Sequence, residues 1–119
     1  MRLALRIEEY VREDGTNPFR EWFESLPAPA AAKVATAVYR LAFGNTSNVK
    51  WFAGIGERII DWGPGYRVYL ARVGPSALLL LGGGTKQSQR ADIGRAVRMH
   101  AQYKSRQAAA RRARSGPHR

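Results

Sequence analysis

The sequence predicts a single α+β domain in which two helices lie on one face of a β-sheet. Three patterns lead to this prediction: apolar residues alternate near the start of the chain, two segments with helical periodicity follow, and alternation returns in the middle. The chain has 119 residues, 45% of them hydrophobic and 24% charged, as in an ordinary globular domain. It is therefore expected to fold into one compact unit.

Local patterns predict the first strand and the two helices that follow it. The alternating apolar residues of the strand are Leu3, Leu5 and Ile7. Asn17 is a suitable cap for a helix that begins at Pro18. The apolar stripe of this helix is Phe19, Trp22, Phe23 and Leu26. Two prolines in the segment 27–29 end it, and a second amphipathic helix is predicted at about 30–43, so the two form a helical hairpin.

The rest of the chain predicts three strands and a last helix. Alternating apolar residues flank the turn Gly63-Pro64-Gly65, which predicts a β-hairpin. Residues 77–81 are apolar throughout and predict a central strand, which the glycines at 82–84 are expected to end. A helix begins after Lys86. The predicted order is β-α-α-β-β-β-α, and the three consecutive later strands favour antiparallel pairing.

The pairing across the hairpin turn decides which side chains share a face. A three-residue turn places Trp62 opposite Tyr66, so that Arg67 faces Asp61 on the side away from the core. Tyr69 then lies on that same side. The pattern fits either a solvated Asp61–Arg67 pair or a surface for phosphate contact and base stacking, with two lysines near it, Lys50 and Lys86.

The formal net charge of +11 favours polyanionic partners. Six cations and no carboxylate follow from Lys104 onward, so we expect a domain at 1–104 and a basic tail at 105–119. The tail either adds nonspecific attraction or is a solvated extension. The alternating start does not predict a signal peptide, and nothing approaches the roughly 20 apolar residues of a membrane span. A cytoplasmic protein without a membrane partner is expected.

Metal and nucleotide chemistry find little support in the sequence. There is no cysteine, and the two histidines form no ligand cluster, so neither a metal nor a cofactor is expected. The run from Gly82 to Lys86 differs from a phosphate-binding loop because no Ser or Thr follows the lysine and the glycine spacing is wrong. Lys86 nevertheless precedes a predicted helix N-terminus, which favours an anion.

Several motifs together resemble one known family. In chain order they are Asn17-Pro18-Phe19 with Trp22, then Gly44-Asn45, the segment from Glu57 to Tyr69, and Gly82 to Lys86 followed by Gln89, Asp92 and Ile93. This pattern, from about residue 17 to 104, resembles the RelE/ParE toxin superfamily and more closely its phage-derived HigB-like branch, the addiction module killer proteins. The resemblance implies a curved antiparallel sheet packed against two N-terminal helices, with a C-terminal helix.

The resemblance also implies a function. It predicts the toxin of a type II toxin–antitoxin system that inhibits translation as a ribosome-dependent, metal-independent mRNA endoribonuclease, or mRNA interferase. Its partners would be mRNA, the ribosome and a small helix-turn-helix antitoxin. Two alternatives stay open: a ParE-like poison of DNA gyrase, and a non-catalytic RNA-binding relative.

Site residues follow from the resemblance as well. The expected catalytic residues are Arg67, Tyr69 and Lys86. Arg67 would hold the scissile phosphate, Tyr69 would stack on a base or share a proton, and Lys86 would supply a second cation. The expected RNA-binding residues are Lys50, Arg58 and Arg90. Many relatives have Arg where this chain has Ile59, and Arg58 points to the other face unless a bulge redirects it. The candidate proton carriers are Glu57, Asp61, Tyr69 and Asp92.

Overall fold

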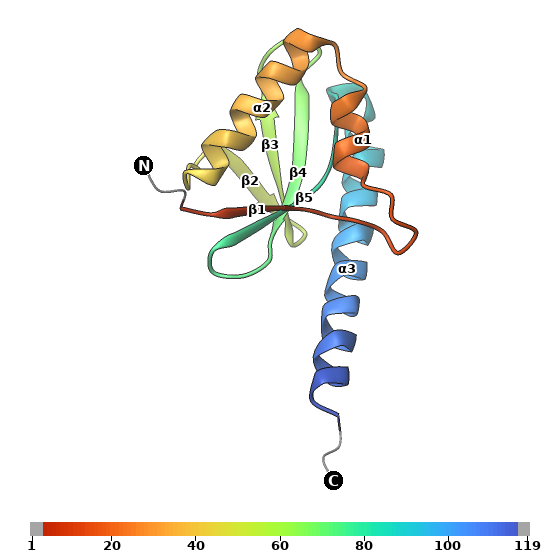
Figure 1. Cartoon of the computed structure of the whole chain (residues 1–119). Coiled ribbons are helices and arrows are strands. Elements are labelled where there is room, and N and C mark those ends of the chain that lie inside the picture. Colours follow the sequence, from red (N-terminus) through yellow and green to blue (C-terminus); the bar gives the residue numbers. More distant parts are fainter. Residues whose placement is uncertain (1–3, 117–119) are drawn as a thin grey trace.

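The computed structural model describes residues 4–116 and confirms an α+β fold (Figure 1). Its elements are β1 (Arg6–Glu9), α1 (Pro18–Glu24), α2 (Ala28–Ala42), β2 (Val49–Phe52), β3 (Ile55–Ile60), β4 (Tyr66–Arg72), β5 (Ala77–Gly84), the 3-10 turn η1 (Lys86–Ser88) and α3 (Gln89–Arg114). Asn17 caps α1 as predicted, because its side-chain oxygen accepts a hydrogen bond from the Arg20 amide at 2.9 Å. Of the predicted first strand, Leu3 lies outside the described residues.

The sheet has five strands in the order β1-β5-β4-β3-β2. The antiparallel pairing of β3, β4 and β5 is confirmed, and β5 is central. The expectation of a wholly antiparallel sheet is wrong, because β1 pairs in parallel with β5. No short turn joins these two strands, so the chain between them does not force opposite directions. The short edge strand β2 was not predicted, and the glycines at 82–84 continue β5 rather than end it.

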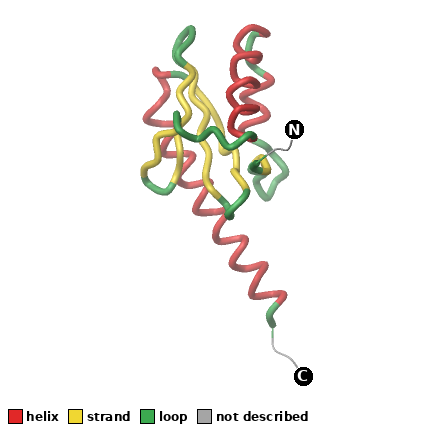
Figure 2. The backbone as a smooth tube through the Cα atoms, turned by 90° about the vertical axis from the view of Figure 1, so that its left-hand side faces the viewer, coloured by secondary structure: helices red, strands yellow, loops and turns green. Residues whose placement is uncertain are grey.

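Both faces of the sheet are covered by helices, and Figure 2 shows the strands between them. Alternation along β4 sends successive side chains to opposite faces. Val68 and Leu70 pack with Val34 and Leu41 of α2 in one core cluster. The prediction that Tyr69 lies on the side away from the core is wrong, because α3 covers that side. Tyr69 belongs to a second core cluster there, whose other buried members include Leu79, Leu81, Ala96 and Met99. The sheet therefore lies between two buried layers of side chains, one packed against α2 and the other against α3.

The helix α3 is longer than the sheet it covers, and its last turns project from the body (Figure 1). Tyr10 donates a hydrogen bond to the Gln102 side chain at 2.9 Å, and Arg106 donates to the Val11 carbonyl at 2.8 Å. The basic segment expected as a tail thus continues this helix as far as Arg114. Among residues 4–116, no helix has the length and apolarity required to cross a membrane.

The end of β5 is held by a close contact with α1. A Cβ atom added at Gly83 would lie 2.3 Å from the Trp22 ring, so only glycine leaves room for this indole. Trp22 in turn packs against Tyr66 of β4, with ring centroids 6.4 Å apart. The glycine therefore sets the distance between α1 and the sheet.

Gly83→Ala is expected to lower the free energy of unfolding by about 1–3 kcal/mol, because an overpacked core must shift α1 or the strand. Urea denaturation measures the change. Gly94→Ala in α3 is the control, because a Cβ there meets only the end of the Arg98 side chain at 3.4 Å. Replacing glycine inside a helix should raise stability by up to about 1 kcal/mol. Equal effects of the two substitutions would contradict the assigned contact.

Candidate functional site

The hairpin register places different side chains together from those predicted. Ile60 pairs with Tyr66, so residues 61–65 form a five-residue turn rather than a three-residue one. The Trp62 amide donates to the Ile60 carbonyl at 2.8 Å within this turn. The predicted pair of Asp61 with Arg67 is therefore wrong. The residue opposite Arg67 is Ile59, and Glu57 lies opposite Tyr69.

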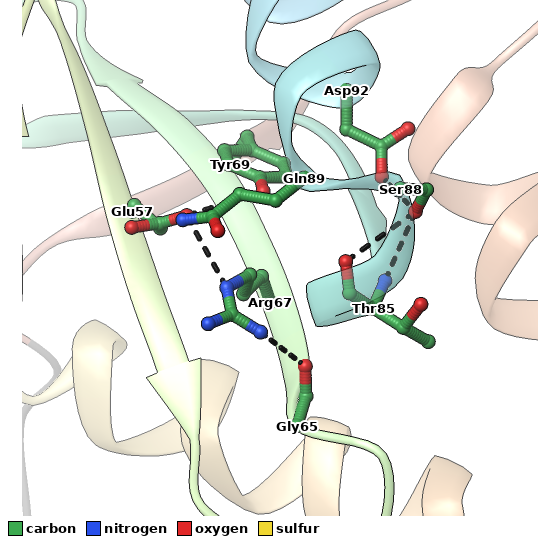
Figure 3. Close-up of polar contacts among 8 residues, drawn as sticks. All are labelled: Glu57, Gly65, Arg67, Tyr69, Thr85, Ser88, Gln89 and Asp92. Carbon is green, nitrogen blue, oxygen red and sulfur yellow. Dashed lines mark hydrogen bonds and ion pairs between the residues drawn. The ribbon is translucent and has the colours of Figure 1, made fainter.

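Glu57 is the centre of a buried polar cluster on the face covered by α3 (Figure 3). Its Oε2 atom accepts hydrogen bonds from the Tyr69 hydroxyl at 3.2 Å and from Gln89 Nε2 at 2.8 Å. Arg67 Nε lies 3.4 Å from the same oxygen and completes an ion pair. Glu57 and Tyr69 are each 1% exposed and Arg67 is 7% exposed. We call these four residues the Glu57 cluster.

Most of the N–H donors of the Arg67 guanidinium make no hydrogen bond within the described residues. Its Nη1 donates to the Gly65 carbonyl at 2.6 Å, the one hydrogen bond of this guanidinium within the described residues. Nε is buried without a hydrogen bond, since 3.4 Å to Glu57 makes an ion pair but not a hydrogen bond of good geometry. A guanidinium carries five N–H donors in a planar fork that matches a phosphate. The side chain is thus held in place with donors to spare.

Gly65 brings Lys86 close to Arg67. A Cβ atom added at Gly65 would lie 3.2 Å from Arg67 Nη1 and 3.9 Å from Lys86 Cβ. The φ angle of this glycine is +75°, a conformation that other residues rarely adopt. Lys86 itself is exposed at the start of η1. The exposed Lys86 and the buried Arg67 therefore lie on either side of the same glycine.

The other predicted cations divide between the two faces of the sheet. Lys50 is exposed and pairs in register with Glu57, so it borders the cluster. Arg58 lies on the opposite face: it pairs with Val68, and its Nη1 donates to the Ile59 carbonyl at 2.5 Å. Burial, followed by repulsion from Arg40 of α2, lowers the pKa of Arg58. Strand alternation holds and no bulge redirects Arg58, while Arg90 is exposed in the first turn of α3.

Ile59 matters because it pairs with Arg67 in the sheet. An arginine at this position would project on the same face as Arg67. The present chain has the uncharged sec-butyl side chain of isoleucine there instead. The predicted cations that remain around this part of the sheet are Arg67, Lys86 and Lys50.

Asp92 belongs to a neighbouring group of polar residues that closes the start of α3. Ser88 donates to Asp92 Oδ2 at 2.5 Å, and the Thr85 amide donates to Ser88 Oγ at 3.2 Å. Arg95 pairs with the other oxygen of this carboxylate. Gly84 permits the contact, because a Cβ there would lie 1.9 Å from Asp92 Oδ2. Both carboxylate oxygens are occupied, which favours a structural role for Asp92 over that of a free base.

A cleft of about 420 Å³ opens beside this group, between α1, the end of β5 and α3. Its lining residues include Trp22, Tyr69, Gly84, Ser88 and Asp92. Among residues 4–116, no three His, Cys, Asp or Glu side chains are arranged to hold a metal ion. The candidate site is thus a cationic, hydrogen-bonded corner where β4, β5 and the start of α3 meet.

Burial raises the pKa of the Tyr69 hydroxyl, and the negative charge of Glu57 raises it further. The phenol therefore keeps its proton at neutral pH and acts as a hydrogen-bond donor. Stacking on a base requires an exposed ring, which Tyr69 does not have. The Tyr69 hydroxyl is instead engaged in its hydrogen bond to Glu57.

Sequence reasoning missed the partnership of Glu57 with Gln89. These residues are separated by 32 positions in the chain. Glu57 was considered only as one proton carrier among four, because the assumed three-residue turn moved it out of line with Tyr69. A turn of five residues, Asp61 to Gly65, fits the same glycines and would have aligned the two side chains.

The comparisons with known proteins identify one relative. Over 80 residues the chain is 41% identical to an uncharacterized protein of Haemophilus influenzae, and the match spans 66% of this chain and 81% of that protein. The chain belongs to the same family as this protein. No family model matches the sequence, and no solved structure matches it either.

Tyr69→Phe is expected to lower the free energy of unfolding by about 1.5–3 kcal/mol at pH 7. The substitution removes the hydrogen bond from the Tyr69 hydroxyl to the charged Glu57 carboxylate. The difference from wild type should shrink as the pH rises above about 10. At such pH the Tyr69 hydroxyl is ionised in the unfolded wild-type chain but stays protonated in the folded one. This difference lowers the free energy of unfolding of wild type, and it is missing in the variant, which has no hydroxyl at residue 69. Urea titrations at both pH values measure this.

Tyr39→Phe provides the control for this substitution. Tyr39 is exposed on α2, and its ring contacts Phe43 with the centroids 4.8 Å apart. Removing its hydroxyl should change stability at pH 7 by no more than about 0.5 kcal/mol. A similar loss in both variants would argue against a special contact at Tyr69.

Proposed function

We propose that this protein is the toxin of a type II toxin–antitoxin system, of the RelE/ParE superfamily and its HigB-like branch, and that it cleaves mRNA on the ribosome. The observation that carries the proposal is the Glu57 cluster with Lys86 beside it. This arrangement presents two cations to a phosphate from a rigid corner of the sheet. The sequence resemblance supports the same assignment.

In this proposal the cluster works by electrostatics and positioning. Lys86 contacts a phosphate of the incoming strand, and the free donors of Arg67 bind the scissile phosphate behind it. Glu57 holds Arg67 by an ion pair, while Tyr69 and Gln89 hold Glu57. Tyr69 and Gln89 are thus positioning residues. Because the donors are already oriented, little reorganisation is needed when charge builds up on the phosphate.

The reaction proposed is an internal transfer at phosphorus. The 2′-hydroxyl oxygen of the preceding ribose forms a bond to phosphorus, and the bond from phosphorus to the 5′ oxygen breaks. The hydroxyl loses its proton and the leaving oxygen gains one. The products are a 2′,3′-cyclic phosphate and a 5′-hydroxyl end. Negative charge on the phosphate oxygens is greatest in the transition state, where Arg67 and Lys86 stabilise it most.

The partner of such a toxin would be a small helix-turn-helix antitoxin that neutralises it. The ribosome would supply the aligned mRNA, since proximity and orientation lower the barrier of a transfer that needs an in-line arrangement. A strong net positive charge speeds association with a ribosome, which is itself a polyanion.

Lys86→Gln should lower the rate of transcript cleavage by about 10²- to 10³-fold, the usual effect of removing one donor to a developing oxyanion. Lys86 is exposed, so the variant should fold normally. Arg67→Lys is a second variant that retains the charge and loses the planar fork. Arg98→Gln removes one charge from an exposed part of α3 and is the matched control. Circular dichroism checks that all four proteins are folded.

The measurement is the mapping of transcript 5′ ends and ribosome positions after induction of the isolated chain in a bacterial host. We expect growth arrest by wild type and the control, with new 5′-hydroxyl ends inside translated regions. An mRNA with a 2′-deoxy nucleotide at the cleavage position should resist cleavage by purified protein and ribosomes. Arrest with intact transcripts would reject the nuclease, and DNA breaks in that case would indicate a gyrase poison instead.

A further inference from the structure

A second basic surface lies on α3, away from the Glu57 cluster. It is a groove of about 320 Å³ between the end of β4 and the middle of α3. Its lining residues are Arg72, Val73, His100, Tyr103, Lys104, Gln107 and Arg111. We call it the His100 groove. It contains basic side chains and no carboxylate.

The charge of this groove is not neutralised by neighbours on its own helix. No Asp or Glu follows Asp92 in the sequence. The other flank of α3 differs, because the pocket around Arg106 includes Glu13 and Asp14. Basic residues on that flank thus have acidic neighbours, whereas Lys104 and Arg111 face an acid-free groove. An uncompensated positive groove attracts phosphate.

The groove and the Glu57 cluster lie along the same flank of α3. Gln89, His100, Lys104 and Arg111 follow at intervals of eleven, four and seven residues, which keeps them on one side of a helix. Gln89 contacts Glu57 of β3, and a Cβ at Gly54, just before β3, would lie 3.9 Å from His100 Nδ1. At 1.5 Å per residue, Gln89 and Lys104 are separated by about 22 Å along the helix.

We propose that the His100 groove binds the backbone of the same single-stranded RNA whose scissile phosphate lies at the Glu57 cluster. This inference rests on the proposed function and extends it by naming a second contact on the substrate. The strand would pass from Lys86 and Arg67 along the flank of α3 to Lys104 and Arg111. The projecting end of α3 lengthens that track beyond the body (Figure 1).

Nucleic acid fits this surface better than a lipid membrane. A helix that binds a membrane surface needs large apolar side chains on the face opposite its charges. From Lys104 to Arg114, α3 contains only Lys, Arg, Ser, Gln and Ala. The segment has cations to neutralise phosphates and nothing to insert among acyl chains.

The test compares two double variants that remove the same charge. Lys104→Gln with Arg111→Gln changes the groove. Arg98→Gln with Arg112→Gln changes two exposed arginines of α3 outside the groove lining. The affinity of each protein for a single strand of about 20 nucleotides is measured over a range of salt concentrations. Each phosphate contact on a single strand contributes about 0.7 to the slope of log affinity against log salt.

The groove variant should lower that slope by about 1.4, for two lost contacts, and weaken binding most at low salt. The matched variant should leave the slope close to that of wild type. A dinucleotide is too short to reach across the roughly 22 Å between Gln89 and Lys104, so the groove substitutions should weaken its binding much less than that of the 20-nucleotide strand. This dependence on length separates a track from general attraction.

Equal losses in the two double variants would overturn the proposal, because net charge alone would then explain binding. A loss of helicity in the groove variant, seen by circular dichroism, with binding unchanged would also overturn it, because the cations would then serve only the helix C-terminus. Binding of the same proteins to vesicles of anionic phospholipid is measured to test a membrane as the alternative ligand of the groove. Vesicle binding that falls in the groove variant while RNA binding stays unchanged would refute the RNA track.

Transcript cleavage measured on the same proteins keeps the two proposals apart. If wild type binds RNA with the groove-dependent slope and cleaves nothing, the nuclease proposal fails and the RNA track stands. If all three proteins cleave and bind long RNA equally well, the nuclease stands and the RNA track fails.

Discussion

The buried pair of Glu57 and Arg67 is the constraint around which the α3-facing side of the sheet is built. A carboxylate that is 1% exposed is costly unless it is paired and hydrogen-bonded. Glu57 meets that requirement with an ion pair to Arg67 of β4 and with hydrogen bonds from Tyr69 of β4 and Gln89 of α3. The first turn of α3 is thereby tied to the middle of the sheet. The same contacts orient a guanidinium whose remaining donors stay free.

Three glycines allow side chains of other elements to approach the backbone closely at the corner where β4, β5 and the start of α3 meet. Gly83 admits Trp22 of α1 and Gly84 admits Asp92 of α3, so helices from both faces reach the same end of β5. Gly65 lets Arg67 and Lys86 lie together across the hairpin turn. Side chains at these positions would push apart elements that are distant in the chain. The cationic corner thus depends on missing Cβ atoms as much as on the charged groups themselves.

The helix α3 joins two kinds of surface in one rigid element. Its first half is buried through Ala96 and Met99 and holds the Glu57 cluster through Gln89. Its second half contacts the body through Gln102 and Arg106. Its last turns project from the body (Figure 1), and their arginines are exposed. Hydrogen bonds within the helix fix the spacing between these halves. The distance between the Glu57 cluster and the basic residues of the second half of α3 is therefore fixed before any ligand binds.

The sequence by itself determined the α+β class, the cap at Asn17, the central strand β5 and the antiparallel order of β3 to β5, because periodicity and capping are local properties. It also indicated Arg67 and Lys86 as neighbours. Only the tertiary structure decided the five-residue turn, the parallel pairing of β1 and the contact between Glu57 and Gln89. Each of these depends on which distant segments pack together, and a one-dimensional pattern does not specify that choice. A register shift of two residues keeps every side chain on its predicted face, so alternation could not reveal it.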